Sequence, residues 1–138
     1  MADNRQGFRG YVTSRAFGEY RIPVPLQSLA LRDYCARNGM RFVLPVNENS
    51  FPHSYLVLEG IIEDLTNYDG IVMCSVHMLP QRPERRRRIY QRVLKQACSL
   101  HMVIEGFVVA SPADVERVEE LLRLNSLAPR LQDNAPMS

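Results

Sequence analysis

The segment at positions 71–76, Ile-Val-Met-Cys-Ser-Val, restricts the fold most strongly, because its side chains are apolar or small throughout. A strand with one exposed face alternates polar and apolar residues, whereas a central strand of a parallel sheet is covered on both faces and lacks that alternation. Segments with the apolar spacing of helices stand on both sides of it. We therefore expect strands and helices to alternate around a buried parallel strand.

The rest of the chain fits this alternation. The predicted strands are residues 8–14, 40–44, 71–76 and 101–110, and the predicted helices are about 25–37, 55–65, 83–98 and 112–124. Proline at 25 and 83 suits a first helical turn, and Asn38-Gly39 suits a helix end. The pattern predicts a three-layer α/β/α fold with right-handed crossovers and a mainly parallel four-stranded sheet, flavodoxin-like or resolvase-like.

The length of 138 residues and the hydrophobic content of 46% suit a single domain. We expect an N-terminal tail at 1–7, one α/β domain at 8–124 and a loosely ordered tail at 125–138. The first residues lack the apolar core of a signal peptide and no apolar run approaches a membrane span, so a soluble, cytoplasmic protein is expected. The three widely spaced cysteines predict buried, reduced thiols.

The charge of the chain does not select nucleic acid as a partner, because 17 basic and 15 acidic residues leave a net charge of +2. Four consecutive arginines at 85–88 suggest such binding. Consecutive residues point around a helix, however, and positive charge at a helix start opposes the helix dipole. An exposed helix face is therefore favoured over phosphate binding. Arg82 and Arg85 are the two expected to reach a pocket at the strand ends.

The loop after the first predicted strand is the expected ligand site, since parallel sheets bind ligands at the carboxyl ends of their strands. A helix N-terminus and guanidinium groups both favour oxyanions. We predict that an anion is held here by residues of the loop and the following helix. The predicted binding residues are Arg15, Glu19, Arg21 and Gln27, with Ser14 beside them. The alternative is that these charges only solvate a mobile loop.

Three side chains are candidates for catalysis. Ser14 can donate a hydrogen bond or act as a nucleophile, and His77, directly after the third predicted strand, can act as an acid or a base. Glu105 lies inside the fourth predicted strand, where a carboxyl group needs a partner such as Arg15 or Arg82. An internal salt bridge is the equal alternative for Glu105. The histidine spacing and the absence of GxGxxG and GxxxxGK[ST] motifs predict neither a metal nor a nucleotide cofactor.

Part of the sequence resembles the catalytic domain of serine recombinases. The residues that carry this likeness are Gly10, Tyr11, Ser14, the segment 68–72 and Leu79. The recombinase pattern has an arginine on the first strand and an Asp-Arg pair before the leucine. Here Val12 or Thr13 stands at the first place, and His77-Met78 stands at the second. The resemblance implies a similar fold and argues against strand exchange.

A larger set of residues carries a second likeness. It comprises Gly10-Tyr11, Ser14-Arg15, Phe17, Glu19, Arg21, Pro23, Gln27, Arg32 to Cys35, Glu48, Tyr55, Leu58-Glu59, Asp69 to Val72, Ser75, Leu79-Pro80, His101 and Glu105-Gly106. Over about residues 9–124 the chain resembles the sporadic carbohydrate cluster proteins, small bacterial proteins of surface-polysaccharide loci. Ala16, Val24, Ser28, Cys74 and His77 depart from that pattern.

The second resemblance implies a small enzyme or accessory protein of activated-sugar or surface-carbohydrate biosynthesis, with the reaction left open. An anionic sugar intermediate would then be held by Arg15 and Arg21, with Glu105 as the acid or base. The alternative is a non-catalytic, resolvase-like dimerisation or scaffold module, since such domains commonly pair through helices. A homodimer or higher homo-oligomer is expected. A nucleic-acid-binding regulator using residues 85–88 is the third and least favoured hypothesis.

Overall fold

The structure is a computed structural model that describes residues 5–48, 50, 51 and 53–133, with side chains to residue 126. Strands and helices alternate along most of the chain, as predicted. The elements are β1 (Phe8–Thr13), α1 (Val24–Arg37), β2 (Phe42–Glu48), α2 (Leu56–Glu63), η1 (Leu65–Asn67), β3 (Gly70–Met73), η2 (Val76–Met78), α3 (Pro83–Lys95), β4 (Ser99–Met102), β5 (Phe107–Val109) and α4 (Pro112–Asp133).

The sheet has five strands in the order β2-β1-β3-β4-β5. The pairs β1–β2, β1–β3 and β3–β4 are parallel, which confirms the predicted mainly parallel sheet. The predicted count of four strands is wrong, because β5 pairs with β4 in the antiparallel direction. Chain order reverses between β1 and β3, so the crevice at the carboxyl ends of these two strands is where such folds bind ligands.

The fourth predicted strand, at 101–110, is in fact a hairpin of β4 and β5. The chain turns after Met102, where the N–H of Gly106 donates to the Met102 carbonyl at 3.0 Å. Gly106 has a φ of +72°, in the left-handed region that glycine adopts without a steric penalty. The apolar character of both arms concealed this turn, because Phe107, Val108 and Val109 continue the apolar residues of β4.

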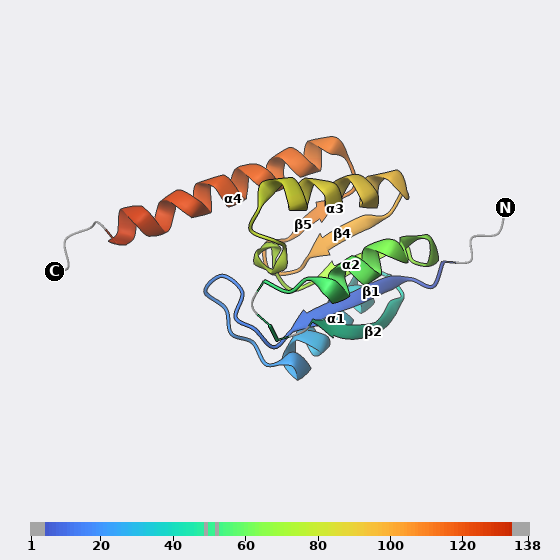
Figure 1. Cartoon of the computed structure of the whole chain (residues 1–138). Helices are drawn as coiled ribbons and strands as arrows, with labels where there is room; N and C mark the ends of the chain where they lie inside the picture. Colours follow the sequence, from blue (N-terminus) through green and yellow to red (C-terminus); the bar gives the residue numbers. More distant parts are fainter. Residues whose placement is uncertain (1–4, 49, 52, 134–138) are drawn as a thin grey trace.

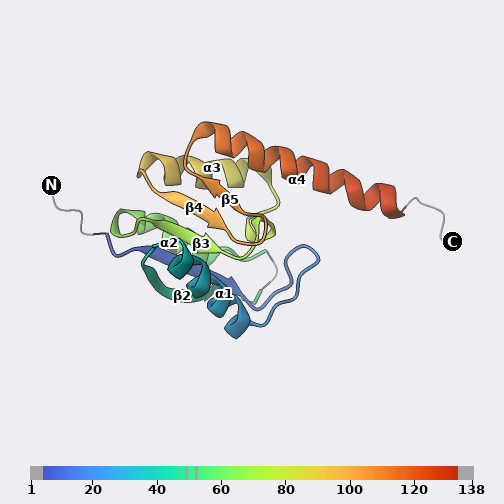
Figure 2. The ribbon, with the colours of Figure 1, turned by 180° about the vertical axis from the view of Figure 1, so that it is seen from behind.

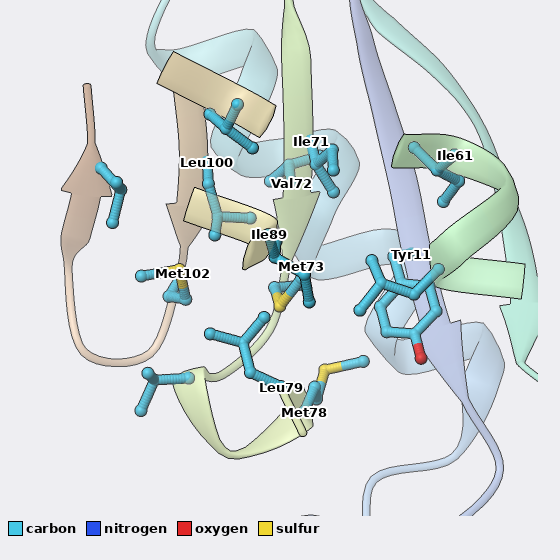
Figure 3. Packing of buried hydrophobic residues seen from close by; sticks show 14 of the residues in the cluster. Tyr11, Ile61, Ile71, Val72, Met73, Met78, Leu79, Ile89, Leu100 and Met102 are labelled. Atoms are coloured by element: carbon cyan, nitrogen blue, oxygen red, sulfur yellow. The ribbon is translucent and has the colours of Figure 1, made fainter. Parts of the chain in front are cut away.

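The helices form two layers around the sheet (Figures 1 and 2). α1 covers one face, and α2 and α3 cover the other. Figure 3 shows that side chains from β1, β3, β4, α2, α3 and η2 meet in one core. In β3 the side chains of Ile71, Val72 and Met73 are all 0% exposed, as the continuous apolar run predicted. Cys35, Cys74 and Cys98 are buried, and none of them forms a disulfide bond within the described residues.

A buried ion pair joins α3 to α4. The guanidinium of Arg86 donates two hydrogen bonds to the Glu119 carboxylate, at 2.8 and 2.9 Å, and two more to the carbonyls of Pro80 and Gln81. Tyr90 Oη donates to the same carboxylate at 2.7 Å. The bond to Glu119 raises the pKa of Arg86. Although burial works to raise the pKa of Glu119, the bonds from Arg86 and Tyr90 hold it below its ordinary value.

The last helix is longer than expected. Its predicted end was about residue 124, where a polar segment with two prolines begins, but α4 continues to Asp133. In Figures 1 and 2 its first part lies beside α3, and its later part extends past the carboxyl ends of the parallel strands. No helix in the described part of the chain combines the length and the apolar character needed to cross a membrane.

His101 on β4 is buried between aromatic rings. Its Nδ1 and Nε2 form hydrogen bonds of 2.8 Å with Tyr34 Oη and Ser99 Oγ, and Phe8 meets its ring edge to face. Burial lowers the pKa of His101 from 6.5 to about 4. The unfolded chain therefore binds a proton at a higher pH than the folded chain, so acid favours unfolding.

Lowering the pH from 7.5 to 5 is expected to cost about 2 kcal/mol of unfolding free energy through His101. The loss is spread over the interval between the unfolded pKa of 6.5 and the folded pKa of about 4. Urea unfolding at the two pH values should show a smaller loss in His101→Gln than in the parent protein. The control is His53→Gln, at an exposed histidine. An equal loss in His101→Gln and the parent would contradict the assignment.

Candidate functional site

The candidate site lies where the carboxyl ends of β1 and β3 meet. The chain leaves β1 through the loop 14–23 and leaves β3 through η2, and the β4–β5 turn closes on the same edge. There the N–H of Ile104 donates to the carbonyl of Cys74 at 2.7 Å. This edge therefore gathers the predicted site residues Ser14, His77 and Glu105 from three separate segments.

The loop after β1 is attached to the core by one aromatic side chain. Phe17 is 4% exposed, and its backbone exchanges two hydrogen bonds with Tyr20, which makes a tight turn. The predicted ligand-binding side chains Glu19 and Arg21 are exposed, and so is Ser14. The loop is thus held in place at its middle, while its charged side chains face outward.

Arg15 points toward α2. Its guanidinium donates to the carbonyl of Phe51 at 2.9 Å and lies over the ring of Tyr55, with 5.2 Å from Cζ to the ring centroid. Arg85 lies over the same ring at 5.2 Å and donates to Glu59 at 3.1 Å. Arg15 and Arg85, both predicted to bind ligand, are therefore brought together on Tyr55, which sequence reasoning did not select.

Gln27 is wholly buried, and its side chain forms hydrogen bonds with backbone groups. Its side-chain oxygen accepts from Thr13 N at 3.1 Å, and its Nε2 donates to the carbonyls of Thr13 and Ile22 at 2.6 and 2.7 Å. These three bonds tie the start of α1 to the end of β1 and to the loop. In this structure Gln27 positions the loop, and its predicted contact with a ligand stays a prediction.

Glu105 lies in the β4–β5 turn and not inside a strand, which corrects the expected placement. Its carboxylate accepts from Ser75 Oγ at 2.7 Å and from Val76 N at 2.8 Å. Its partners are therefore the start of η2, where we had expected Arg15 or Arg82. Burial, reinforced by the charge of Glu105, raises the pKa of the neighbouring Cys74 thiol to about 11, so this thiol is not a nucleophile at neutral pH.

His77 and Arg82 occupy the segment between β3 and α3. The half-buried imidazole of His77 lies so close to Gly18 that a Cβ atom at that glycine would stand 2.9 Å from its Cγ. His77 also lines a hollow of about 730 Å³, whose other walls come from the start of α3 and from α4. Arg82 is exposed at the N-cap of α3. Arg15, Arg21 and Glu105 do not line this hollow.

The buried carboxyl group at this edge that sequence reasoning missed is Glu48. It is 3% exposed at the end of β2 and accepts from Tyr11 Oη at 2.8 Å. It also accepts from the backbone N–H groups of Val57 and Leu58, each at 3.1 Å, which begin α2. A glutamate between a predicted strand and a predicted helix was the available signal, since a helix start favours a carboxylate.

No group of three His, Cys, Asp or Glu side chains among the described residues could hold a metal ion. The carboxyl groups that are buried here, Glu48 and Glu119, bind protein hydrogen-bond donors. The edge offers a ligand arginine guanidinium groups, the exposed Ser14 hydroxyl and the half-buried imidazole of His77.

The five-stranded, mainly parallel sheet with this helix arrangement is a resolvase-like fold. The N-terminal catalytic domain of TP901-1 integrase superposes with a TM-score of 0.56 and 14% identity, over 89% of this chain and 98% of that one. A resolvase family site-specific recombinase from Streptococcus pneumoniae superposes with a TM-score of 0.61 and 9% identity, over 91% and 93%. At these identities the likeness concerns the fold alone.

Sequence comparison finds no family model and no curated protein that matches the chain. The structural likeness agrees with the resemblance to serine recombinases that the sequence indicated. The comparisons give no evidence for the sporadic carbohydrate cluster family. The carbohydrate role and the sugar-binding role of Arg15 and Arg21 stay predictions.

Proposed function

We propose that this chain is a resolvase-like interaction module that pairs with a second copy through α4 and does not exchange DNA strands. The observation that carries the proposal is the length of α4. Its 22 residues span about 33 Å, and it packs on β5 and α3, which lie beside its first part. Val115 and Val118 are buried, whereas Leu124 is 51% exposed.

The sequence of α4 supports pairing along its extended part. Leucine occurs at positions 121, 124, 127 and 131, with spacings of three and four. Apolar residues three and four positions apart lie on one side of a helix, and such a side is usually covered by another element. Leu121 packs against the core of this chain, whereas Leu124 is exposed. Within this chain, α4 packs on α3 and β5, which lie beside its first half. In the proposed dimer, a second copy of α4 covers Leu124, which is exposed in this chain.

Two positions argue against strand exchange. The recombinase pattern has an arginine on the first strand, but Val12 or Thr13 stands there, and both are buried. The Thr13 hydroxyl accepts from the backbone N–H of Arg15 at 3.1 Å. The pattern also has an Asp-Arg pair before Leu79, where Met78 is 3% exposed in the core. None of these side chains supplies the guanidinium groups that hold a phosphate.

Leu124→Glu is expected to convert a dimer into a monomer, because a charged side chain at a buried helix–helix contact loses its hydration without a partner. Light scattering coupled to size-exclusion chromatography, across the micromolar range, measures the change. Ser126→Glu is the matched control: it adds the same charge two residues further on, on the opposite face of the helix. A parent protein that stays monomeric throughout this range, or equal dissociation of both variants, would sink the proposal.

A further inference from the structure

A second hollow lies between α2 and α3, away from the extended part of α4. Its volume is about 270 Å³. The lining residues are Tyr55, Glu59, Ile62, Glu63, Pro80, Arg85, Arg88, Ile89 and Arg92. Because pockets of roughly 300 Å³ are at the small end for ligand sites, it suits a small molecule better than a polymer.

The α3 wall of this groove is strongly basic. Arg85, Arg88 and Arg92 are separated by three and four residues, so they lie on one face of the helix within a 60° arc by the geometry of about 100° per residue. Like charges at this spacing repel one another and weaken a helix. An anion bound on this face would offset that repulsion.

Only part of this charge is balanced within the protein. Arg85 is held by Glu59 and by the ring of Tyr55. Arg88 and Arg92 have no ion-pair partner within 4.0 Å among the described residues, and both are exposed. These two guanidinium groups remain available to a ligand, while Arg85 is already placed at one end of the groove.

The floor of the groove is apolar. Ile62 and Ile89 are 7% and 8% exposed, and Pro80 is buried. An anion lying against this floor loses part of its hydration, which strengthens its attraction to a guanidinium group. Glu59 and Glu63 on the α2 wall repel an anion, so it is directed to the α3 wall. Their oxygens can accept hydrogen bonds from hydroxyl groups of the same ligand.

We propose that this groove binds a small ligand with two linked phosphoryl groups, one held by Arg88 and the other by Arg92. The two residues are one helical turn apart, a rise of about 6 Å, so each side chain can hold a separate phosphoryl group. A guanidinium group donates two parallel hydrogen bonds to such an oxyanion, which gives both attraction and orientation. The proposal does not depend on pairing through α4.

Isothermal titration calorimetry of the full chain with inorganic pyrophosphate tests the proposal. The parent protein is expected to bind, and the pair Arg88→Gln and Arg92→Gln to lose at least about tenfold in affinity, because two charge-assisted contacts disappear. The matched control is the pair Arg32→Gln and Arg41→Gln, which removes the same charge from exposed sites outside the groove. Circular dichroism verifies that both variants fold.

The control pair should keep its affinity within about twofold. Inorganic phosphate should bind at least about tenfold more weakly than pyrophosphate, because it engages one guanidinium group. Absence of pyrophosphate binding by the parent protein, or an equal loss in both pairs of substitutions, would overturn the site. Equal affinities for phosphate and pyrophosphate would overturn the assignment of two phosphoryl groups.

Discussion

Replacing Arg86 by methionine is expected to destabilise the folded protein by about 3–5 kcal/mol. Within the described residues, the substitution leaves the Glu119 carboxylate, whose side chain is 12% exposed, with the hydrogen bond from Tyr90 alone. It also removes the donors to the carbonyls of Pro80 and Gln81. Without Arg86, the Glu119 carboxylate either stays poorly hydrated, which destabilises the fold, or becomes hydrated because α4 moves away from α3. Urea unfolding followed by circular dichroism measures the loss.

The neighbouring arginine provides the matched control. Arg87 pairs with Glu116 at 3.2 Å, but both side chains are exposed at 46% and 64%. Arg87→Met should therefore cost no more than about 1 kcal/mol. Adding Glu119→Leu to Arg86→Met should recover much of the loss, because the buried charge is then gone. Similar unfolding free energies for Arg86→Met and Arg87→Met would refute the buried role of Arg86.

Glu48→Leu is expected to destabilise the protein by about 3–5 kcal/mol, the second large effect. The side chain of leucine is similar in size to that of glutamate, but it accepts no hydrogen bond. Tyr11 Oη and the backbone N–H groups of Val57 and Leu58 then lose an acceptor at a buried position. Two of these donors begin α2, so hydrogen exchange should accelerate there first.

Tyr11→Phe distinguishes the contribution of the tyrosine hydroxyl from that of the hydrogen bonds at the start of α2. It removes one donor to Glu48 and leaves the two backbone donors in place, so a cost of about 1 kcal/mol is expected. Both variants can be compared by urea unfolding at pH 7.5. If Glu48→Leu and Tyr11→Phe cost the same, the bonds to α2 contribute nothing, and the role given to Glu48 is wrong.

Much of the architecture followed from local patterns. The run at 71–76 marked the central strand, and the helices that start near Pro25 and Pro83 begin at Val24 and at Pro83. These signals are local because the periodicity of side chains and the preferences of proline act within a few residues. The β4–β5 hairpin escaped detection because apolar residues stand on both sides of Glu105-Gly106, so the whole segment resembled one strand.

The candidate site was harder to predict, because its contacts depend on how distant segments pack. Arg15 and Arg85 both lie over the ring of Tyr55, although Arg15 belongs to the loop after β1 and Arg85 belongs to α3. Glu105 was selected as a buried carboxyl group with a basic partner, yet Ser75 and Val76 bind it. The type of each residue indicated that its charged group would form polar contacts. The packing of distant segments determined which partners it contacts.

By itself, the sequence determined the alternation of strands and helices and the burial of β3, since both arise from the spacing of apolar residues along one chain. Only the tertiary structure decided what the four arginines at 85–88 do. Arg85 and Arg88 lie on the side of α3 that lines the groove beside α2, whereas Arg86 and Arg87 pair with glutamates of α4. The sequence of such a run does not predict the partner of each arginine, because these partners depend on how α2 and α4 pack on α3.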